Sequence, residues 1–253
     1  MTKAIILAAG KGTRMKSDKP KVVHKALGKP MVYYSIEAAY GAGCEQVCVI
    51  VGYKADEVKE SIKDTYKDYN SMSDVISYAL QEEQLGTGHA VRCAGDFIGD
   101  TGNIIVLCGD TPLVTKDTLK KAIDKHIADN NGVTVISAIL EDSFGYGRII
   151  RDENGLSKIV EEKDATCEER LVKEVNSGMY IFNAKALKEA LLEISNDNAQ
   201  GEYYLPDTIE IIKGKGLKVD AVPMDNPDEI RGVNTLDQLA EAEEIMKSRG
   251  EVI

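Results

Sequence analysis

Short apolar runs of strand length alternate with longer helix-like runs over the first 140 residues, and this alternation constrains the fold more than any other sequence feature. The apolar runs are nearly continuous, as in strands that are covered on both faces of a sheet. The expected strands are residues 5–8, 46–51, 75–78, 103–108 and 133–140, and the expected helices are residues 31–40, 55–65, 88–97 and 116–129, the last capped by Thr115. The pattern predicts an α/β fold with a mostly parallel sheet and helices on both faces.

The pattern changes after about residue 140, where we expect a β-rich insertion. Residues 147–151 and 156–160 are strand-like and flank Asn154-Gly155, which is a strong hairpin signal. The elements expected after it are a strand at residues 175–182 and helices at residues 184–194, at residues 203–213 with a start or break near Pro206, and at residues 235–249. Since no internal repeat or low-complexity linker divides the chain, we expect residues 1–234 to form one domain, followed by a C-terminal helical segment at residues 235–253.

The C-terminal segment has the periodicity of an amphipathic helix. Thr235 is a suitable N-cap for it. The residues expected on its apolar face are Leu236, Leu239, Ala240 and Ile245.

The charge balance argues against several classes of partner. The chain carries 31 Lys and Arg against 42 Asp and Glu, a formal net charge of −11. Because nucleic acids and anionic membranes bind basic surfaces, neither is expected as a partner. No run approaches 18 apolar residues, and no signal-peptide pattern opens the sequence. The five cysteines are odd in number and lack zinc-site spacing, which is typical of reduced thiols in a cytoplasmic protein.

The first expected strand runs into a small-residue loop that is strongly basic. Five cations fall within eleven residues, namely Lys11, Arg14, Lys16, Lys19 and Lys21. On an acidic chain this pattern favours a local site for a small anion, because glycine backbone, Arg and Lys can together hold a phosphate. The spacing is not that of a P-loop, and Met15 stands where a dinucleotide fingerprint has its third glycine. A basic, flexible loop without a ligand is the alternative.

Two further loops are expected beside the basic loop, because ligands bind at the carboxyl ends of parallel strands. Residues 81–89 follow an expected strand and open a helix, whose free N–H groups suit a nucleotide. A simple helix-starting turn capped by Thr87 is the alternative. Asp110 directly follows an apolar strand, where a carboxylate can bind a hard cation such as Mg²⁺, and a turn Asp before Pro112 is the alternative.

Two polar clusters mark the β-rich insertion. They are Gly145-Tyr146-Gly147-Arg148 and Glu161-Glu162-Lys163-Asp164. Either could contribute to a site, but a solvated surface is the default interpretation of such a charge run.

Together these segments resemble one family closely. Residues 7–15 (LAAGKGTRM) with Pro20-Lys21 are similar to the signature of the sugar-1-phosphate nucleotidyltransferases. Further motifs resemble, in the same order, the uridylyltransferase domain of the bifunctional bacterial enzyme that makes UDP-N-acetylglucosamine. These motifs are QLGTGHA at 84–90, GDTPL at 109–113, GYGRI at 145–149, IVEEKDA at 159–165, EVNSG at 174–178, NAQGEYY at 198–204 and GVN at 232–234. The resemblance extends from about residue 3 to residue 240.

The resemblance implies a Rossmann-like fold and the Mg²⁺-dependent transfer of UMP from UTP to N-acetylglucosamine 1-phosphate, with release of pyrophosphate. A sugar-phosphate oxygen attacks the α-phosphorus in line, so positioning and charge neutralisation take the place of a protein nucleophile. By resemblance, Arg14 and Lys21 are catalytic, and Asp110 and Asn234 bind Mg²⁺. The implied nucleotide-binding residues are Leu7, Ala8, Ala9, Gly10, Gln81, Gly86 and Thr87, and the implied sugar-binding residues are Gly147, Glu161, Asn176 and Tyr204.

The sequence also departs from the family pattern. Cys108 stands where the family often has Tyr, and Pro206 stands where Thr is common, which leaves the sugar open. The family enzyme continues into a trimer-forming β-helix with acetyltransferase activity, and the hexapeptide repeats of that half do not occur here. The chain is therefore a piece of a longer protein or a stand-alone form, without acetyltransferase activity and of open oligomeric state. The functional alternatives are a nucleotidyltransferase for another sugar 1-phosphate and a non-catalytic nucleotide-binding module.

Overall fold

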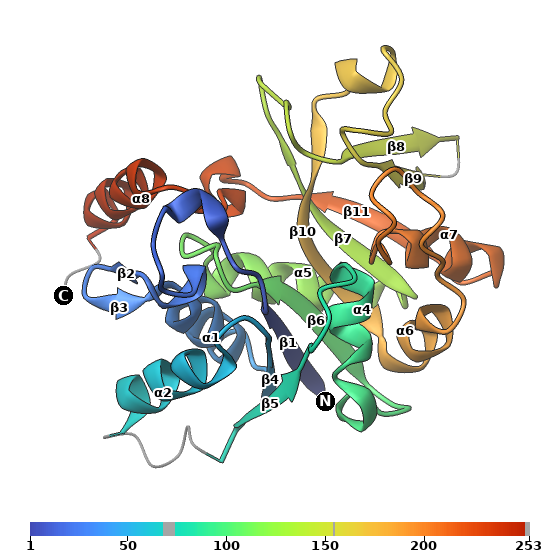
Figure 1. Cartoon of the computed structure of the whole chain (residues 1–253). Helices are drawn as coiled ribbons and strands as arrows, with labels where there is room; N and C mark the ends of the chain where they lie inside the picture. Colours follow the sequence, from blue (N-terminus) through green and yellow to red (C-terminus); the bar gives the residue numbers. More distant parts are fainter. Residues whose placement is uncertain (68–73, 154, 251–253) are drawn as a thin grey trace.

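A nine-stranded sheet forms the centre of the computed structural model, which describes residues 1–67, 74–153 and 155–250 (Figure 1). Its strands are β1 (Thr2–Ala8), β4 (Gln46–Val51), β5 (Ile76–Leu80), β6 (Asn103–Cys108), β7 (Val133–Ile139), β8 (Arg148–Asp152), β9 (Gly155–Val160), β10 (Glu174–Asn183) and β11 (Val219–Pro223). The strand order is β11-β7-β10-β6-β1-β4-β5, with β8 paired to β10 and to β9. The α/β fold class predicted from the sequence is confirmed.

The strands that carry the basic loop and its neighbours are parallel. Strand β1 pairs in parallel with β4 and β6, and β4 pairs in parallel with β5. Ile5 and Ile6, which point to opposite faces of the sheet, are both fully buried, as expected of a strand covered on both sides. The carboxyl ends of β1, β5 and β6 therefore meet at one edge, as the sequence predicts.

One central strand runs against this pattern. Strand β10 is antiparallel to both of its neighbours, β6 and β7. It follows the β8–β9 hairpin rather than a crossover helix, so it enters the sheet from the opposite end. Strand β11 then pairs in parallel with β7, and no sequence signal predicted it.

Helices cover both faces of the sheet, as predicted. Apolar side chains of α1 (Met31–Gly41), α2 (Ala55–Tyr66) and α5 (Lys116–Ala128) join one buried cluster with strand residues. Those of α4 (Thr87–Arg92), α6 (Ala184–Leu191) and α7 (Asp207–Gly214) join a second cluster on the other face. In the part of the chain that the structure describes, no helix has the length and apolarity to traverse a bilayer.

Helix boundaries differ from the expected ones by three or more residues at three places. Helix α6 ends at Leu191 rather than at residue 194. Helix α4 ends at Arg92, and a short 3-10 turn at Gly95–Phe97 replaces its expected second half. Gly95 has a φ of +53°, a left-handed conformation that stops an α-helix. Helix α7 begins only after Pro206, so the expected break near that proline is confirmed as a start.

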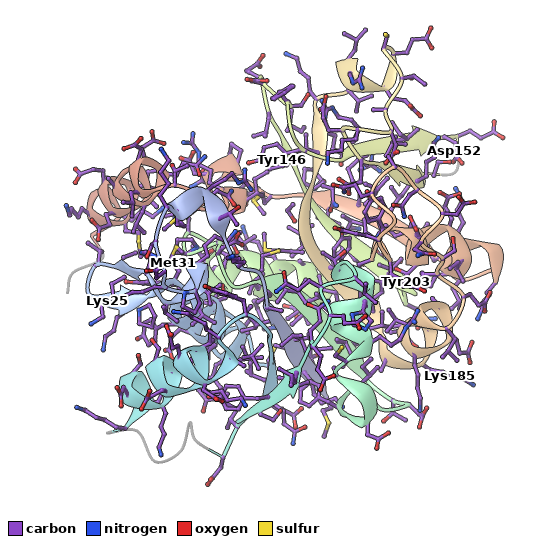
Figure 2. All side chains as sticks on the ribbon, viewed as in Figure 1. Lys25, Met31, Tyr146, Asp152, Lys185 and Tyr203 are labelled. Atoms are coloured by element: carbon purple, nitrogen blue, oxygen red, sulfur yellow. The ribbon has the colours of Figure 1, made fainter. Side chains whose placement is uncertain are left out.

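The predicted hairpin is present as β8 and β9, which pair antiparallel with Asp152 opposite Gly155. Asn154 of the predicted turn lies outside the described residues. Figure 2 shows Tyr146 and Asp152 at opposite ends of β8, with Tyr146 at the end that faces the middle of the molecule.

The C-terminal helix, α8 (Leu236–Ser248), packs against a third apolar cluster. Ala26 of this cluster belongs to the small sheet of β2 (Lys25–Ala26) and β3 (Lys29–Pro30), and Leu113 and Val233 also contribute. Thr235 caps the helix by accepting a hydrogen bond from the Gln238 amide at 3.2 Å, as predicted. The expected apolar face is partly wrong, because Leu236 and Ala240 are exposed. The residues that pack inward are Leu239, Ala242, Ile245 and Met246.

Candidate active site

A hollow of about 330 Å³ lies where the carboxyl ends of β1, β5 and β6 meet, and we call it the nucleotide hollow after the ligand that the sequence resemblance implies there. It brings together three loops that are far apart in the sequence. Of the residues that the sequence singled out, its walls contain Leu7, Ala8, Ala9, Gly10, Lys21, Gln81, Gly86, Thr87 and Asp110. Arg14 and Asn234 lie beside this lining rather than in it. The residues that sequence reasoning missed are Val22, Gln84, Ala90 and Glu202; Cys108, which the sequence marked only as a departure from the family pattern, also lines it.

Four polar side chains form a cluster at the rim of the nucleotide hollow. The Lys21 ammonium contacts the Asp110 carboxylate and donates to Asn234 Oδ1 at 2.9 Å. Arg14 donates to the same Asn234 oxygen at 2.8 Å. The Val233 amide donates to the Asp110 carbonyl at 2.9 Å, which brings Asn234 beside Asp110. The Lys21 ammonium nitrogen thus contacts both the Asp110 carboxylate and the Asn234 amide oxygen, two groups that sequence spacing alone could not pair.

Gly12 fixes the course of the basic loop. Its φ is +66°, and a Cβ added there would overlap the Cβ of Lys21. Glycine is therefore required both by the backbone conformation and by the close approach of Lys21. Met15 anchors the loop with a side chain that is 1% exposed, while Arg14 remains exposed above the rim.

Hydrogen bonds fix the orientation of the Gln81 side chain, which is 4% exposed. Its amide nitrogen contacts the Gly86 carbonyl at 3.1 Å and His89 Nδ1 at 3.2 Å. Since a carbonyl oxygen only accepts, the NH₂ group must face Gly86, and the Gln81 oxygen is left as an acceptor. The nearby Gln84 donates to the Ala9 carbonyl at 2.8 Å and so ties this loop to the loop after β1.

The start of α4 is held by a distant segment. Gly86 has a φ of +107°, and a Cβ added there would lie 2.7 Å from the Tyr203 carbonyl oxygen. Gly86, rather than Thr87, is the N-cap residue of α4. The Thr87 hydroxyl instead accepts a hydrogen bond from the Leu205 amide at 3.1 Å, so the capping role considered for Thr87 is wrong.

A second hollow, of about 230 Å³, adjoins the first, and we call it the sugar hollow, again after the ligand that the sequence resemblance implies. Gly147, Glu161 and Asn176 line it, as the sequence suggested. Tyr204 does not line it, because its hydroxyl is held by the Gln200 amide at 2.6 Å and its ring is buried. Leu205 and Pro206, which follow Tyr204 in the sequence, line the hollow instead. The other lining residues are Leu7, Thr87, Cys108, Gly145, Tyr146, Ser177, Gly178 and Tyr180. Both departures from the family pattern, Cys108 and Pro206, thus face the sugar hollow.

A bulge in β10 aims Asn176. The pairing of β10 with β7 shifts register between Asn176 and Met179, where Gly178 has a φ of +78°. The Asn176 side chain accepts from the Gly178 amide at 3.0 Å and donates to the Tyr180 hydroxyl at 2.6 Å. No sequence signal marks Tyr180, which is 2% exposed.

Among the described residues that line the sugar hollow, Glu161 is the one carboxyl group, and further carboxyl groups lie near it. Burial raises the pKa of Glu161, and the neighbouring Asp164 and Asp207 raise it further. Burial also raises the pKa of Asp207 to about 6, with Glu210 and Asp164 adding to the effect. The Cys108 thiol has its pKa raised to about 12, mainly by burial and also by Asp110, so it is protonated at neutral pH.

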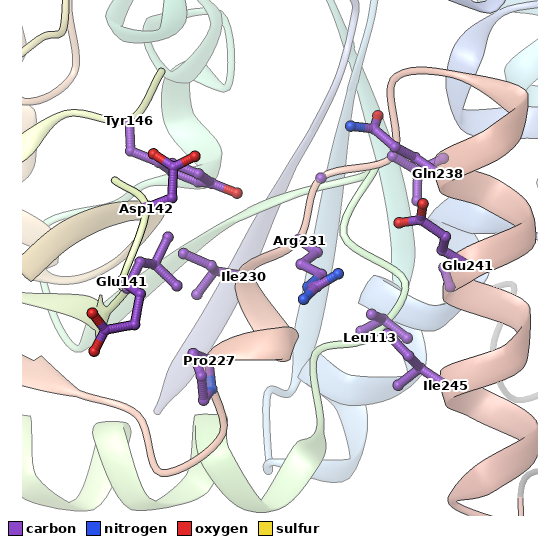
Figure 3. A pocket seen from close by; sticks show the side chains of 14 residues that line it. Leu113, Glu141, Asp142, Tyr146, Pro227, Ile230, Arg231, Gln238, Glu241 and Ile245 are labelled. Carbon is purple, nitrogen blue, oxygen red and sulfur yellow. The ribbon is translucent and has the colours of Figure 1, made fainter. Parts of the chain in front are cut away.

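A third hollow, of about 390 Å³, lies between residues 141–146 and helix α8 (Figure 3). Figure 3 shows Asp142 and Tyr146 on one side, Gln238 and Glu241 on the other, and Arg231 between them. Tyr146 lines both this hollow and the sugar hollow. Arg231 pairs with Asp228 at 2.8 Å.

Known proteins resemble this chain in both sequence and fold. The Nucleotidyl transferase family model matches residues 3–226. A relative named "Bifunctional protein GlmU" from Caldanaerobacter subterraneus subsp. tengcongensis is 52% identical over 247 residues, which cover 97% of this chain and 52% of the relative. A relative of the same name from Clostridioides difficile is 50% identical over 248 residues, covering 98% of this chain and 52% of the relative. The chain therefore spans about half the length of the curated relatives that it matches.

Solved structures with low sequence identity have the same fold. A UDP-glucose pyrophosphorylase complexed with UDP-glucose superposes with a TM-score of 0.78 at 21% identity, over 98% of this chain and 99% of that chain. A putative glucose-1-phosphate thymidylyltransferase from Bacillus anthracis gives a TM-score of 0.77 at 18% identity, over 97% and 95% of the two chains. With the family match over most of its length, the chain belongs to the nucleotidyl transferase family.

Proposed function

We propose that the chain transfers UMP from UTP to N-acetylglucosamine 1-phosphate, giving UDP-N-acetylglucosamine and pyrophosphate. The catalytic unit in this proposal is residues 1–234. The observation that carries the proposal is that the nucleotide and sugar hollows share Leu7, Thr87 and Cys108 in their walls, beside the Lys21 cluster. Two phosphorylated substrates can therefore lie next to one another beside two cations.

The chemistry needs positioning more than a protein nucleophile. An oxygen of the sugar phosphate attacks the α-phosphorus of UTP, a new P–O bond forms, and the bond from the α-phosphorus to the bridging oxygen of pyrophosphate breaks. Arg14, exposed above the rim, neutralises the departing pyrophosphate with its fork of N–H donors. Lys21 supplies a point charge to the reacting phosphates. Holding both substrates in one geometry supplies much of the acceleration.

The oxygen ligands beside Lys21 suit Mg²⁺. Asp110 and Asn234 already share one cationic nitrogen, so their oxygens can face a common cation. Among the described residues, no group of three or more His, Cys, Asp and Glu side chains forms a closed metal cage. Mg²⁺ is commonly held by one or two protein oxygens, substrate phosphates and water, which fits this open pair. When bound, it would neutralise negative charge on the phosphates.

The walls of the two hollows give each substrate its partners. In the nucleotide hollow, the free Gln81 oxygen accepts from the N–H of uracil, while Gly86 and Thr87 seat the base. The chain at Leu7, Ala8, Ala9 and Gly10 allows the nucleotide to approach the backbone closely. In the sugar hollow, Gly147, Glu161 and Asn176 contact the sugar, and we place Tyr204 behind its wall as a support.

The relatives favour this sugar, because they are named for the bifunctional protein GlmU, whose uridylyltransferase domain the sequence resembles. Another sugar 1-phosphate is the second candidate, and it is favoured by Cys108 and Pro206, which both line the sugar hollow. A net charge of −11 supports small phosphorylated partners rather than nucleic acid. Five free cysteines support a cytoplasmic location.

A matrix of substrates tests the proposal. Each of the four nucleoside triphosphates is combined with N-acetylglucosamine, glucosamine and glucose 1-phosphates in the presence of Mg²⁺, and pyrophosphate is measured. UTP with N-acetylglucosamine 1-phosphate is expected to give the highest kcat/KM. A higher value with another sugar phosphate would favour the second candidate, and binding of UTP without turnover in any combination would contradict the proposed transferase.

A further inference from the structure

Arg148 is the least exposed of the Asp, Glu, Lys and Arg side chains that the structure describes. It is the first residue of β8 and is 2% exposed. Its guanidinium pairs with the Glu162 carboxylate at 2.8 Å. The charge run at residues 161–164 was expected to be solvated surface by default, yet its second residue holds a buried arginine.

The ion pair holds the backbone of the loop before β8 from two sides. Arg148 Nη1 donates to the Tyr146 carbonyl, and Arg148 Nη2 donates to Glu162 Oε2. The same Glu162 oxygen accepts from the Gly145 amide at 3.2 Å. Arg170 contacts the other Glu162 oxygen at 3.3 Å from the solvent side. The Gly145 N–H and the Tyr146 carbonyl are thus held by one carboxylate and one guanidinium.

The residues held in this way form one wall of the sugar hollow. Gly145, Tyr146 and Gly147 all line it, and so does Glu161, the residue before Glu162. Gly147 packs directly on Glu161, because a Cβ added at Gly147 would lie 3.2 Å from Glu161 Oε1. The Gly147 carbonyl also accepts from the Asn176 amide at 2.8 Å, so the wall is continuous from β9 to β10.

Stability alone does not account for this pair, in which Arg148 is buried but the Glu162 side chain is 21% exposed. Even a fully buried ion pair is often replaced by apolar residues of similar volume without loss of stability. The Arg148 Nε–H has no hydrogen-bond partner among the described residues, which adds a desolvation cost. What the guanidinium provides is a planar fork that fixes two acceptors at defined directions.

We infer that Arg148 and Glu162 are positioning residues that hold the Gly145–Gly147 wall and Glu161 in the geometry that binds the sugar phosphate. This inference rests on the proposed function, since it names the substrate whose binding the pair controls. It assigns the pair no contact with UTP, because neither residue lines the nucleotide hollow.

The test compares Glu162→Gln and Arg148→Lys with a second Arg–Glu pair, which joins β8 to β10. Arg151 makes a bidentate pair with Glu174, with both contacts at 2.7 Å, but neither residue lines the sugar hollow. Arg151→Lys and Glu174→Gln therefore remove an Arg–Glu pair without touching the wall. All four variants and the unmodified chain are assayed for KM of each substrate, for kcat and for thermal unfolding.

Glu162→Gln and Arg148→Lys are expected to raise the KM for the sugar phosphate by about tenfold to a hundredfold, the size of effect that a small misplacement produces. The KM for UTP should stay within about twofold, and the matched variants should leave both KM values unchanged. An unmodified chain that turns over no sugar phosphate would overturn the proposed function and, with it, this inference.

If the unmodified chain is active, an unchanged sugar-phosphate KM in either wall variant would overturn the positioning role alone. Equal rises in both KM values, or loss of cooperative unfolding in both wall variants, would show a role in folding instead.

Discussion

The nucleotide hollow and the sugar hollow adjoin each other but are constructed differently. The nucleotide hollow is formed by loops that leave parallel strands, and backbone contacts at Gly12 and Gly86 set its shape. The sugar hollow adds a wall from the loop before β8, the end of β9 and the antiparallel strand β10, where an ion pair with a buried arginine and a bulge set its shape. Substrate binding in the nucleotide hollow should therefore be sensitive to an added Cβ. Binding in the sugar hollow should be sensitive to the loss of charged or polar side chains.

The largest effect is expected in the nucleotide hollow, at Asp110. Asp110→Asn keeps the shape of the side chain but removes the charge that holds Lys21 and the proposed Mg²⁺. We expect kcat to fall at least about a thousandfold, in the range seen when a key electrostatic group is removed. The control is Asp142→Asn, an exposed carboxylate of the third hollow, which should keep the activity. Undiminished turnover by Asp110→Asn would contradict the metal assignment.

Gly12→Ala tests whether close backbone contacts set the shape of the nucleotide hollow. The new Cβ would overlap the Lys21 side chain at a φ of +66°. We expect kcat/KM to fall about a hundredfold through misplacement of Lys21, with a loss of roughly 1–3 kcal/mol in the free energy of unfolding.

Gly216→Ala is the matched control, because Gly216 has a φ of +79° and open space around its Cα. That variant should lose only the stability that the backbone conformation costs and should keep its kcat/KM. Equal activity of the two alanine variants would show that the Lys21 contact is unimportant.

The pH dependence of sugar binding tests whether the sugar hollow depends on its charged side chains. The pKa of Glu161 is raised by burial, Asp164 and Asp207, so this carboxylate takes up a proton at a higher pH than an ordinary Glu. Because the charged form is the better acceptor for sugar hydroxyls, the KM for the sugar phosphate should rise several-fold as the pH falls from about 8 to about 5.5.

Glu161→Gln should have a higher KM that changes much less over the same pH range. The remaining change in that variant measures protonation of the substrate phosphate itself, which titrates near pH 6. An identical pH profile in the variant and the unmodified chain would remove Glu161 from the sugar site.

The smallest effect is expected from thiol reagents. Burial raises the pKa of Cys108 and of Cys44 to about 12 and also raises that of Cys48 and Cys93, whereas Cys167 is exposed. At pH 8 a disulfide reagent should modify one thiol rapidly, without loss of activity, and Cys167→Ser should abolish that phase. Rapid modification of a second thiol that UTP protects would show that Cys108 is more accessible than its burial indicates.

Local signals predicted the nucleotide side of the molecule well. The strands that become β1, β4 and β6 are continuous apolar runs, and the Thr115 cap of α5 is confirmed by its 3.3 Å bond to the Thr118 amide. Their loops converge because parallel strands present their carboxyl ends together. Each of these features is determined by residues within one segment, so it can be predicted from the sequence alone.

The sugar side depended on contacts between segments far apart in the sequence. The direction of β10 follows from a preceding hairpin, and the burial of Arg148 follows from a partner fourteen residues later. Arg and Glu are ordinarily exposed, so composition favoured a surface at this place. Likewise, Leu236 has the right spacing for the buried face of α8, but that face is set by a cluster of distant residues that includes Ala26 and Leu113.

The most direct test of the proposed reaction follows the phosphorus atoms of UTP. The unmodified chain is incubated with Mg²⁺, N-acetylglucosamine 1-phosphate and UTP carrying radioactive phosphorus at either the α or the γ position. We expect the α label to appear in a nucleotide sugar and the γ label to appear, among the products, only in pyrophosphate. Absence of any labelled nucleotide sugar, or transfer of the γ label to the sugar, would contradict it.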